Sequence, residues 1–170
     1  GHMRTLPAAL VALSFALPAP AQTAGRTLLV PDRVFDGTAM HEGWVVLVQG
    51  NRIEAVGPAA QVSAPAGTVT RRQPGLTLLP GLIEGHSHLL LHPYNETSWD
   101  NQVLREPEAL RVARAVNHAR ATLQAGFTTV RDLGTEGAGY SDVGLKQAIE
   151  QGIIPGPRMI VTTRAIVATG

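Results

Sequence analysis

The alternation of strand-like and helix-like segments that begins at Leu82 constrains the fold more than any other feature of the sequence. A strand, a helix, a strand, a helix and a strand are expected in turn over residues 82–88, 107–125, 128–133, 142–151 and 158–163. This order is typical of a parallel sheet whose strands are joined by right-handed crossovers. We therefore expect an α/β fold, and the segment is too short for a closed (β/α)8 barrel, which needs about 250 residues.

The residues before this segment show a pattern of short strands without helical periodicity. Strands are expected over residues 26–30, 33–35, 43–48, 52–56 and 69–79. Gly50 and Asn51 form a two-residue turn that is typical of a tight hairpin between the third and fourth of them. We interpret residues 22–79 as a small β-sandwich module and residues 80–170 as the incomplete, first βαβαβ part of a second domain.

The N-terminal residues are expected to lie outside the fold. Residues 1–2 resemble the remainder of a cleaved tag, and residues 3–21 have the features of a secretory signal peptide. These features are a basic Arg4, an apolar run over residues 6–17 and an A-x-A cleavage site at residues 19–21. The run is shorter than the roughly 20 residues that span a bilayer. The alternative, a buried helix, is disfavoured by its prolines, so we expect export to a bacterial periplasm or secretion.

Composition excludes several classes of function. Lys and Arg total 14 against 13 Asp and Glu, a formal net charge of +1, which offers no basic surface for nucleic acid. The chain has no cysteine, so disulfide frameworks, zinc fingers and cysteine nucleophiles are excluded. Any metal must therefore be held by His, Asp, Glu or a modified side chain.

The chemistry is expected at the end of the first strand of the second domain. His86 and His88 are two residues apart, so on a regular strand their side chains project from the same face. Neutral imidazoles are good ligands for Zn²⁺ and related divalent ions. Barrel enzymes also keep their active sites at the carboxyl ends of their strands. The alternative is a pair of hydrogen-bonded histidines with a structural role.

Four segments resemble the metal-dependent amidohydrolases. They are residues 45–57 (VVLVQGNRIEAVG), 79–88 (LPGLIEGHSH), 126–134 (GFTTVRDLG) and 156–160 (GPRMI). The resemblance extends over residues 27–170 and is to the branch related to imidazolonepropionase, which includes Xaa-Pro dipeptidases and ochratoxin-type amidases. One departure is Glu84, at a position where this family usually has Asp.

The resemblance implies the N-terminal part of a TIM-like (β/α)8 barrel with two divalent metal ions, expected to be Zn²⁺. His86 and His88 would bind the more buried ion. A carboxylated Lys that bridges both ions and the general-base Asp are expected beyond residue 170, since Lys146, the only lysine, falls on a helix. The segment alone is then expected to be inactive, because it needs the rest of the barrel as its partner. The protein is also expected to form a homo-oligomer.

The loop over residues 89–100 is expected to contact substrate, because loops on this face carry specificity in barrels. His92 and Tyr94 in this loop, and Tyr140 after the second strand, are the substrate-binding candidates; a loop that only packs on the rim is the alternative. We expect Arg131 and Asp132 to form a structural ion pair. His118 is expected to be solvated on a helix face shared with Arg111 and Arg114.

The implied function is hydrolysis of an amide or peptide C–N bond by a metal-activated hydroxide. The resemblance indicates a dipeptide, of the Xaa-Pro type, or an N-acyl amino acid such as an ochratoxin-like amide. Two alternatives stay open: a mononuclear deaminase of a cyclic amidine, and a non-catalytic exported binding module. The residues that follow the third strand would distinguish the hydrolase from the deaminase, because a lysine at the end of strand four favours the binuclear hydrolase.

Overall fold

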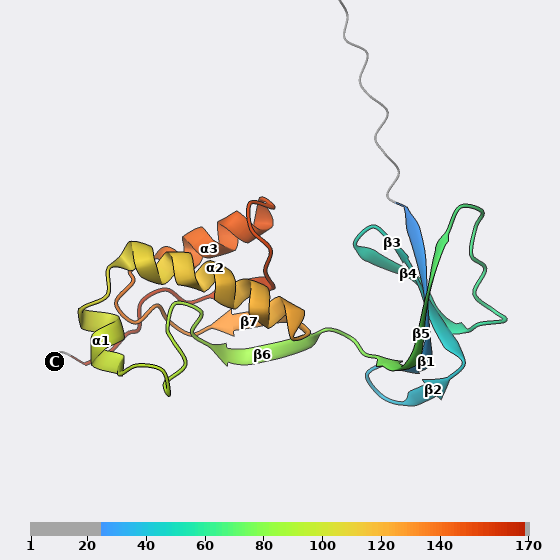
Figure 1. The fold of residues 1–170 in the computed structure, drawn as a ribbon, viewed down its shortest axis with the longest axis horizontal. Coiled ribbons are helices and arrows are strands. Elements are labelled where there is room, and N and C mark those ends of the chain that lie inside the picture. The colour runs from blue at the N-terminus through green and yellow to red at the C-terminus, as the bar shows by residue number, and fades with distance from the viewer. Residues whose placement is uncertain (1–24, 169–170) are drawn as a thin grey trace, which may run out of the picture. The chain divides into compact units, whose positions relative to one another are not determined.

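The computed structural model describes residues 25–168, so the predicted tag remainder and signal peptide lie outside the described residues. The chain forms two compact units that divide between Leu78 and Leu79 (Figure 1). No helix within the described range is long and apolar enough to cross a membrane.

The first unit is a five-stranded sheet. Its strands are β1 (Arg26–Phe35), β2 (Met40–Glu42), β3 (Trp44–Gln49), β4 (Arg52–Pro58) and β5 (Val69–Leu78). The order is β2-β1-β3-β4, and β5 pairs in parallel with β1 while the other pairs are antiparallel. The predicted hairpin turn at Gly50 and Asn51 is confirmed, since Gln49 pairs with Arg52. Residues 25–78 are arranged as this one sheet, and a sandwich stays a prediction.

One prediction for this unit was wrong in detail. The strands expected over residues 26–30 and 33–35 form the single strand β1, although Pro31 lies in its middle. Opposite this proline, the register with β5 slips between Gln73 and Thr77. Gly75, whose φ is +79°, lies in the slip and donates its N–H to the Asp32 carboxylate at 2.8 Å. The Asp32 carboxylate therefore satisfies the Gly75 N–H at the point where the regular ladder between β1 and β5 is interrupted.

The second unit confirms the predicted alternation. It contains β6 (Leu82–Ser87), α1 (Trp99–Leu104), α2 (Glu108–Gln124), β7 (Phe127–Asp132), α3 (Ser141–Glu150) and β8 (Arg158–Val161). The strands form a parallel sheet in the order β6-β7-β8. Helix α1 begins inside residues 89–100, which were expected to form a loop. Ser98 caps this helix by accepting the N–H of Asn101.

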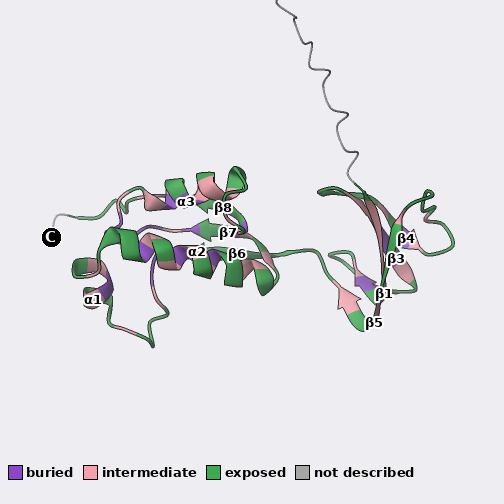
Figure 2. Cartoon of the chain, turned by 45° about the horizontal axis from the view of Figure 1, so that its top comes forward, coloured by how far each residue is buried: buried purple, intermediate pink, exposed green. Residues whose placement is uncertain are grey.

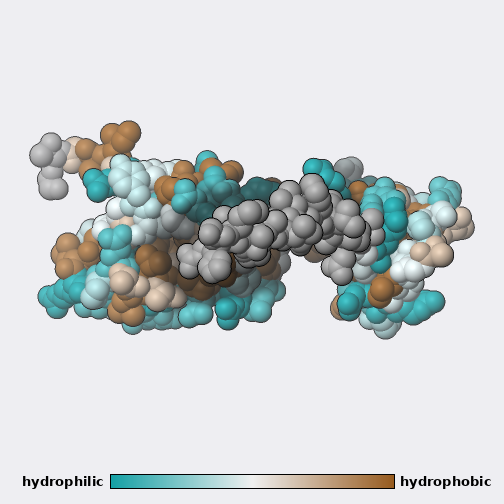
Figure 3. Space-filling view, turned by 90° about the horizontal axis from the view of Figure 1, so that it is seen from above, coloured by the Kyte–Doolittle hydropathy of each residue, from teal (hydrophilic) through white to brown (hydrophobic). Residues whose placement is uncertain are grey.

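Helices α2 and α3 cover one face of this sheet (Figure 1). Val130 pairs with Met159 across β7 and β8, and both are buried in the core with Ala115, Ala119 and Leu145 from the helices (Figure 2). The next pair in register, Arg131 and Ile160, points to the opposite face and is exposed. Figure 3 shows apolar side chains among the hydrophilic ones on the surface of this unit.

Candidate metal centre

His86 and His88 lie together at the carboxyl end of β6. Their ring centroids are 5.2 Å apart, with the ring planes at 65°. The strand is irregular here, because three steps from Glu84 to Ser87 in β6 match two steps in β7. The Nε of Arg131 donates to the Gly85 carbonyl at 2.8 Å, inside this irregular stretch. The two rings therefore meet at a strand end whose pairing with β7 is irregular.

The environment of His88 suits a metal ligand. Its Nδ1 lies 3.0 Å from the carbonyl oxygen of Gly134. A carbonyl can only accept a hydrogen bond, so Nδ1 carries the proton of the neutral ring and Nε2 keeps a free lone pair. Histidines that bind metals commonly donate their other ring N–H to such a carbonyl or to a carboxylate. The side chain is 18% exposed, so it is largely shielded while one edge stays accessible.

His86 is more exposed than His88, and its backbone N–H donates to the Glu84 carboxylate at 2.9 Å. Glu84 thus stabilises the backbone between itself and the first histidine. Among residues 25–168, no group of three or more His, Asp or Glu side chains could hold a metal ion. Within the described residues the candidate ligands are the imidazoles of His86 and His88, and metal binding by them stays a prediction.

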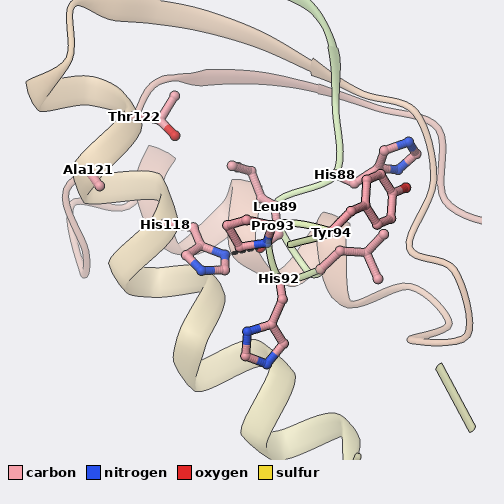
Figure 4. A pocket seen from close by; sticks show the side chains of 9 residues that line it. His88, Leu89, His92, Pro93, Tyr94, His118, Ala121 and Thr122 are labelled. Carbon is pink, nitrogen blue, oxygen red and sulfur yellow. Dashed lines mark hydrogen bonds between the residues drawn. The ribbon is translucent and has the colours of Figure 1, made fainter. Parts of the chain in front are cut away.

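A cavity of about 370 Å³ lies beside His88 (Figure 4). Its wall is formed by the loop after β6 and by one side of α2, through Leu89, Leu91, His92, Pro93, Tyr94, His118, Ala121 and Thr122. Two of the predicted substrate-binding residues, His92 and Tyr94, thus share a cavity with a predicted ligand. The third, Tyr140, is not among the residues that line it; its ring is packed 5.1 Å from the Arg164 guanidinium.

The two candidates in the cavity differ in how they are engaged. The His92 ring lies between two carboxylates, with Nδ1 3.0 Å from Glu96 and Nε2 3.1 Å from Glu106. Glu106 is also paired with Arg114 at 2.7 Å, and this guanidinium, helped by His92, lowers the pKa of Glu106. Tyr94 is 67% exposed. Tyr94 is therefore the freer of the two to contact a ligand.

The expectation of a solvated helix face at His118 was wrong. The His118 Nδ1 lies 2.9 Å from the Leu89 carbonyl, and the ring lines the cavity. Arg111 is only 2% exposed and donates to the carbonyls of Leu90, Thr135 and Glu136. The polar side of α2 therefore faces loop carbonyls, which need donors because they are shielded from water.

The expected ion pair between Arg131 and Asp132 was also wrong. Consecutive residues of a strand point to opposite faces, and here Arg131 is exposed while Asp132 is fully buried. The Asp132 carboxylate instead accepts the backbone N–H groups of Leu89 and Gly134 at 2.8 and 3.3 Å. Burial raises the pKa of Asp132, while these two bonds lower it.

Glu136 lies next to His88 and was not identified from the sequence. Glu136 has a φ of +45°, in the left-handed region that is uncommon for residues other than glycine. Its carboxylate accepts a hydrogen bond from Trp99 Nε1 in α1 and lies 3.8 Å from His88 Nδ1. Both residues line a second cavity of about 710 Å³. The positive φ at a non-glycine residue is a structural signal that no sequence pattern shows.

Comparison with known proteins gives a consistent result. The model of the amidohydrolase family matches residues 77–167. No curated protein sequence matches the chain. Among solved structures, the chain is similar to a Xaa-Pro dipeptidase with bound methionine in the active site, with a TM-score of 0.69 and 24% identity over 84% of this chain and 34% of that one.

Two other solved structures share this similarity. One is a prolidase complexed with N-methylphosphonate-L-proline, with a TM-score of 0.67 and 30% identity over 82% of this chain and 32% of that one. The other is the A. niger ochratoxinase, with a TM-score of 0.66 and 25% identity over 82% and 31% of the two chains. The chain thus spans about a third of the length of these proteins. Its second unit has the fold of the first three strands of a TIM-like barrel.

Proposed function

The chain belongs to the amidohydrolase family, and from this premise we propose that the protein hydrolyses amide or peptide C–N bonds with the help of divalent metal. The observation that carries the proposal is the pairing of His86 and His88 at the carboxyl end of β6, with Nδ1 of His88 bonded to a backbone carbonyl. This arrangement presents imidazole lone pairs where barrel enzymes hold their metals.

His86 and His88 would hold the ion, the latter through Nε2. When bound, a divalent ion such as Zn²⁺ polarises the scissile carbonyl and lowers the pKa of water. A second ion, a bridging carboxylated lysine and a general-base aspartate belong to the same proposal and are expected beyond residue 170. Lys146 is not that lysine, because it lies in α3 with its Nζ 3.8 Å from Glu150.

We propose a dipeptide of the Xaa-Pro type or an N-acyl amino acid as the substrate. The similarity to a prolidase seen with an L-proline phosphonate and to an ochratoxinase supports this class. Tyr94 is the first candidate for a contact to the substrate carboxylate, since its side chain is exposed beside His88. His92 and Tyr140 are further candidates. Export, directed by residues 3–21, and assembly as a homo-oligomer are also proposed.

The test is to replace His86 and His88 by Ala, singly and together, in the full-length protein. We expect loss of most bound divalent metal by elemental analysis and of nearly all hydrolysis of Xaa-Pro dipeptides. His41→Ala is the matched control, since His41 lies in the other unit against Asp36 and should leave both quantities unchanged. Full metal occupancy in a folded double variant would contradict the proposal, as would ammonia release from a cyclic amidine without dipeptide cleavage.

A further inference from the structure

The buried carboxylate of Asp132 lies at the end of β7 and contacts the backbone of Leu89, next to His88, and of Gly134, in the loop after β7. Asp132 is 0% exposed. One of its oxygens accepts the N–H of Leu89, the residue that follows His88 in the chain, at 2.8 Å. The other accepts the N–H of Gly134 at 3.3 Å. A single side chain thus fixes two loops, one after β6 and one after β7.

These contacts form a connected set of hydrogen bonds around His88. The carbonyl oxygen of Gly134 accepts a hydrogen bond from Nδ1 of His88, and the N–H of Gly134 donates a hydrogen bond to Asp132. Leu89 gives its N–H to the other oxygen of the same carboxylate. The position of Asp132 therefore sets both the backbone from which the His88 ring extends and the carbonyl that selects its tautomer.

The chemistry of this position calls for a carboxylate. Both oxygens face N–H donors, and an ionised carboxylate has acceptor capacity on each oxygen. An asparagine of the same shape would place an NH₂ group against one backbone N–H, and two donors cannot bond each other. Gly134 adds a constraint of its own, since its φ of +134° is one that other residues rarely adopt.

We propose that Asp132 is a positioning residue that holds His88 with Nε2 presented to a metal ion. It touches neither the ion nor the substrate and acts through Leu89 and Gly134. The inference rests on the proposed function in one respect, because it takes His88 to be a ligand. Its effect on the tautomer of His88 does not depend on metal and can be measured without it.

Asp132→Asn in the full-length protein is the decisive variant, and Asp142→Asn is its matched control. Asp142 is also 0% exposed and accepts two backbone N–H groups, those of Val143 and Thr163 at 2.9 and 2.8 Å. None of these contacts involves a neighbour of His88. Zinc affinity is measured by chelator competition, and the His88 tautomer by nitrogen NMR of the apoprotein at pH about 8, above the usual histidine pKa of about 6.5.

We expect wild type and Asp142→Asn to show the Nδ1–H tautomer and equal zinc affinity. Asp132→Asn should bind zinc roughly 10- to 100-fold more weakly and show a mixture of tautomers. Equal zinc affinity in the two variants, or an Nε2–H tautomer in the wild type, would overturn the inference. If Asp132→Asn does not fold, Asp132→Ser, which keeps one small acceptor, should show the same loss. A wild type that binds no divalent metal contradicts the proposed function instead, and the tautomer then decides the inference alone.

Discussion

At the scale of single residues, buried charges organise the loops that surround the histidine pair. Arg111 supplies three donors to carbonyls of the loops after β6 and β7, and Asp132 supplies two acceptors to N–H groups of the same loops. The positive side chain thus binds backbone carbonyls and the negative one binds backbone N–H groups, and the two charges are not used to bind each other. Loops with unpaired buried polar groups would be costly, so these two side chains allow irregular backbone at the site to be shielded from water.

Asp36 gives a pH-dependent prediction in the first unit. Its carboxylate accepts the N–H groups of Thr38 and Ala39 and contacts His41 at 2.8 Å. These bonds, first that of Ala39, lower the pKa of Asp36 from its ordinary 3.8 to about 2. A depressed pKa means stability that is present above 3.8 and is lost as the pH falls towards about 2.

We therefore expect acidification from pH about 5 to about 2 to lower the Tm of the wild type more than that of Asp36→Asn. Asparagine keeps an acceptor oxygen for the turn but cannot titrate. Thermal unfolding at several pH values measures the difference. Asp100→Asn is the control, as Asp100 is an exposed residue in the second unit. Identical pH dependence of the wild type and Asp36→Asn would refute the role of the turn.

At the scale of elements, local signals predicted the strands and helices that have long or unambiguous patterns. The hairpin at Gly50 and the end of α2 at Gly126, whose φ is +97°, follow directly from residue types that suit those backbone conformations. The strand β2 has only three residues and α1 only six, too few for periodicity to be detected. Ser98 was the available signal for α1, since it is a preferred cap residue.

The site was predictable only in part for a different reason. His86 and His88 could be predicted as ligands because their spacing and position at a strand end are local features. Leu89, which donates to Asp132, is 43 residues away from it in the chain, and the partners of Arg111 are 21 to 25 residues away, so no local pattern reveals these contacts. His118 shares one side of α2 with Arg111 and Arg114, and the sequence therefore suggested that this side faces solvent. Loop carbonyls that need donors explain why that side is shielded instead.

The entry to β6 gives a prediction about packing between strands. A Cβ added to Gly81 would lie 2.7 Å from the Cβ of Thr128 in β7 and nearer still to its other side-chain atoms. A Cβ cannot rotate away, so β6 and β7 would have to separate. Gly81→Ala should destabilise the protein by about 1–3 kcal/mol.

Gly144→Ala is the matched control for this packing prediction. A Cβ at Gly144, within α3, meets nothing within 4 Å. Alanine there should raise the free energy of unfolding by about 0.4–1 kcal/mol, because it restricts the unfolded chain and favours the helix. Urea denaturation of both variants measures the two effects, which must have opposite signs. A Gly81→Ala protein as stable as the wild type would show that β6 and β7 can be spaced differently.

At the scale of the whole molecule, the second unit is an open part of a closed architecture. Its sheet has one face covered by α2 and α3, while Ile83 and Ile160 are 73% and 53% exposed. The solved structures of similar fold are about three times as long as the stretch matched here. In a closed barrel these isoleucines face the interior, where side chains fill the space. Under the proposed function, the described residues would contribute one pair of metal ligands, His86 and His88.

The substrate class can be tested on the full-length protein through Tyr94. If its hydroxyl binds the substrate carboxylate, Tyr94→Phe removes one hydrogen bond to a charged group, which costs about 1.5–3 kcal/mol. The value of kcat/KM for a Xaa-Pro dipeptide should then fall roughly 10- to 150-fold. Metal content should stay unchanged because Tyr94 is not an expected ligand, and this separates the prediction from that for His86 and His88.

The C-terminal amide of the same dipeptide is the matched substrate, and it should be cleaved poorly by both proteins. Equal kcat/KM for the acid and the amide would mean that the carboxylate is not recognised, and the proposed substrate would be wrong while the metal proposal still stood.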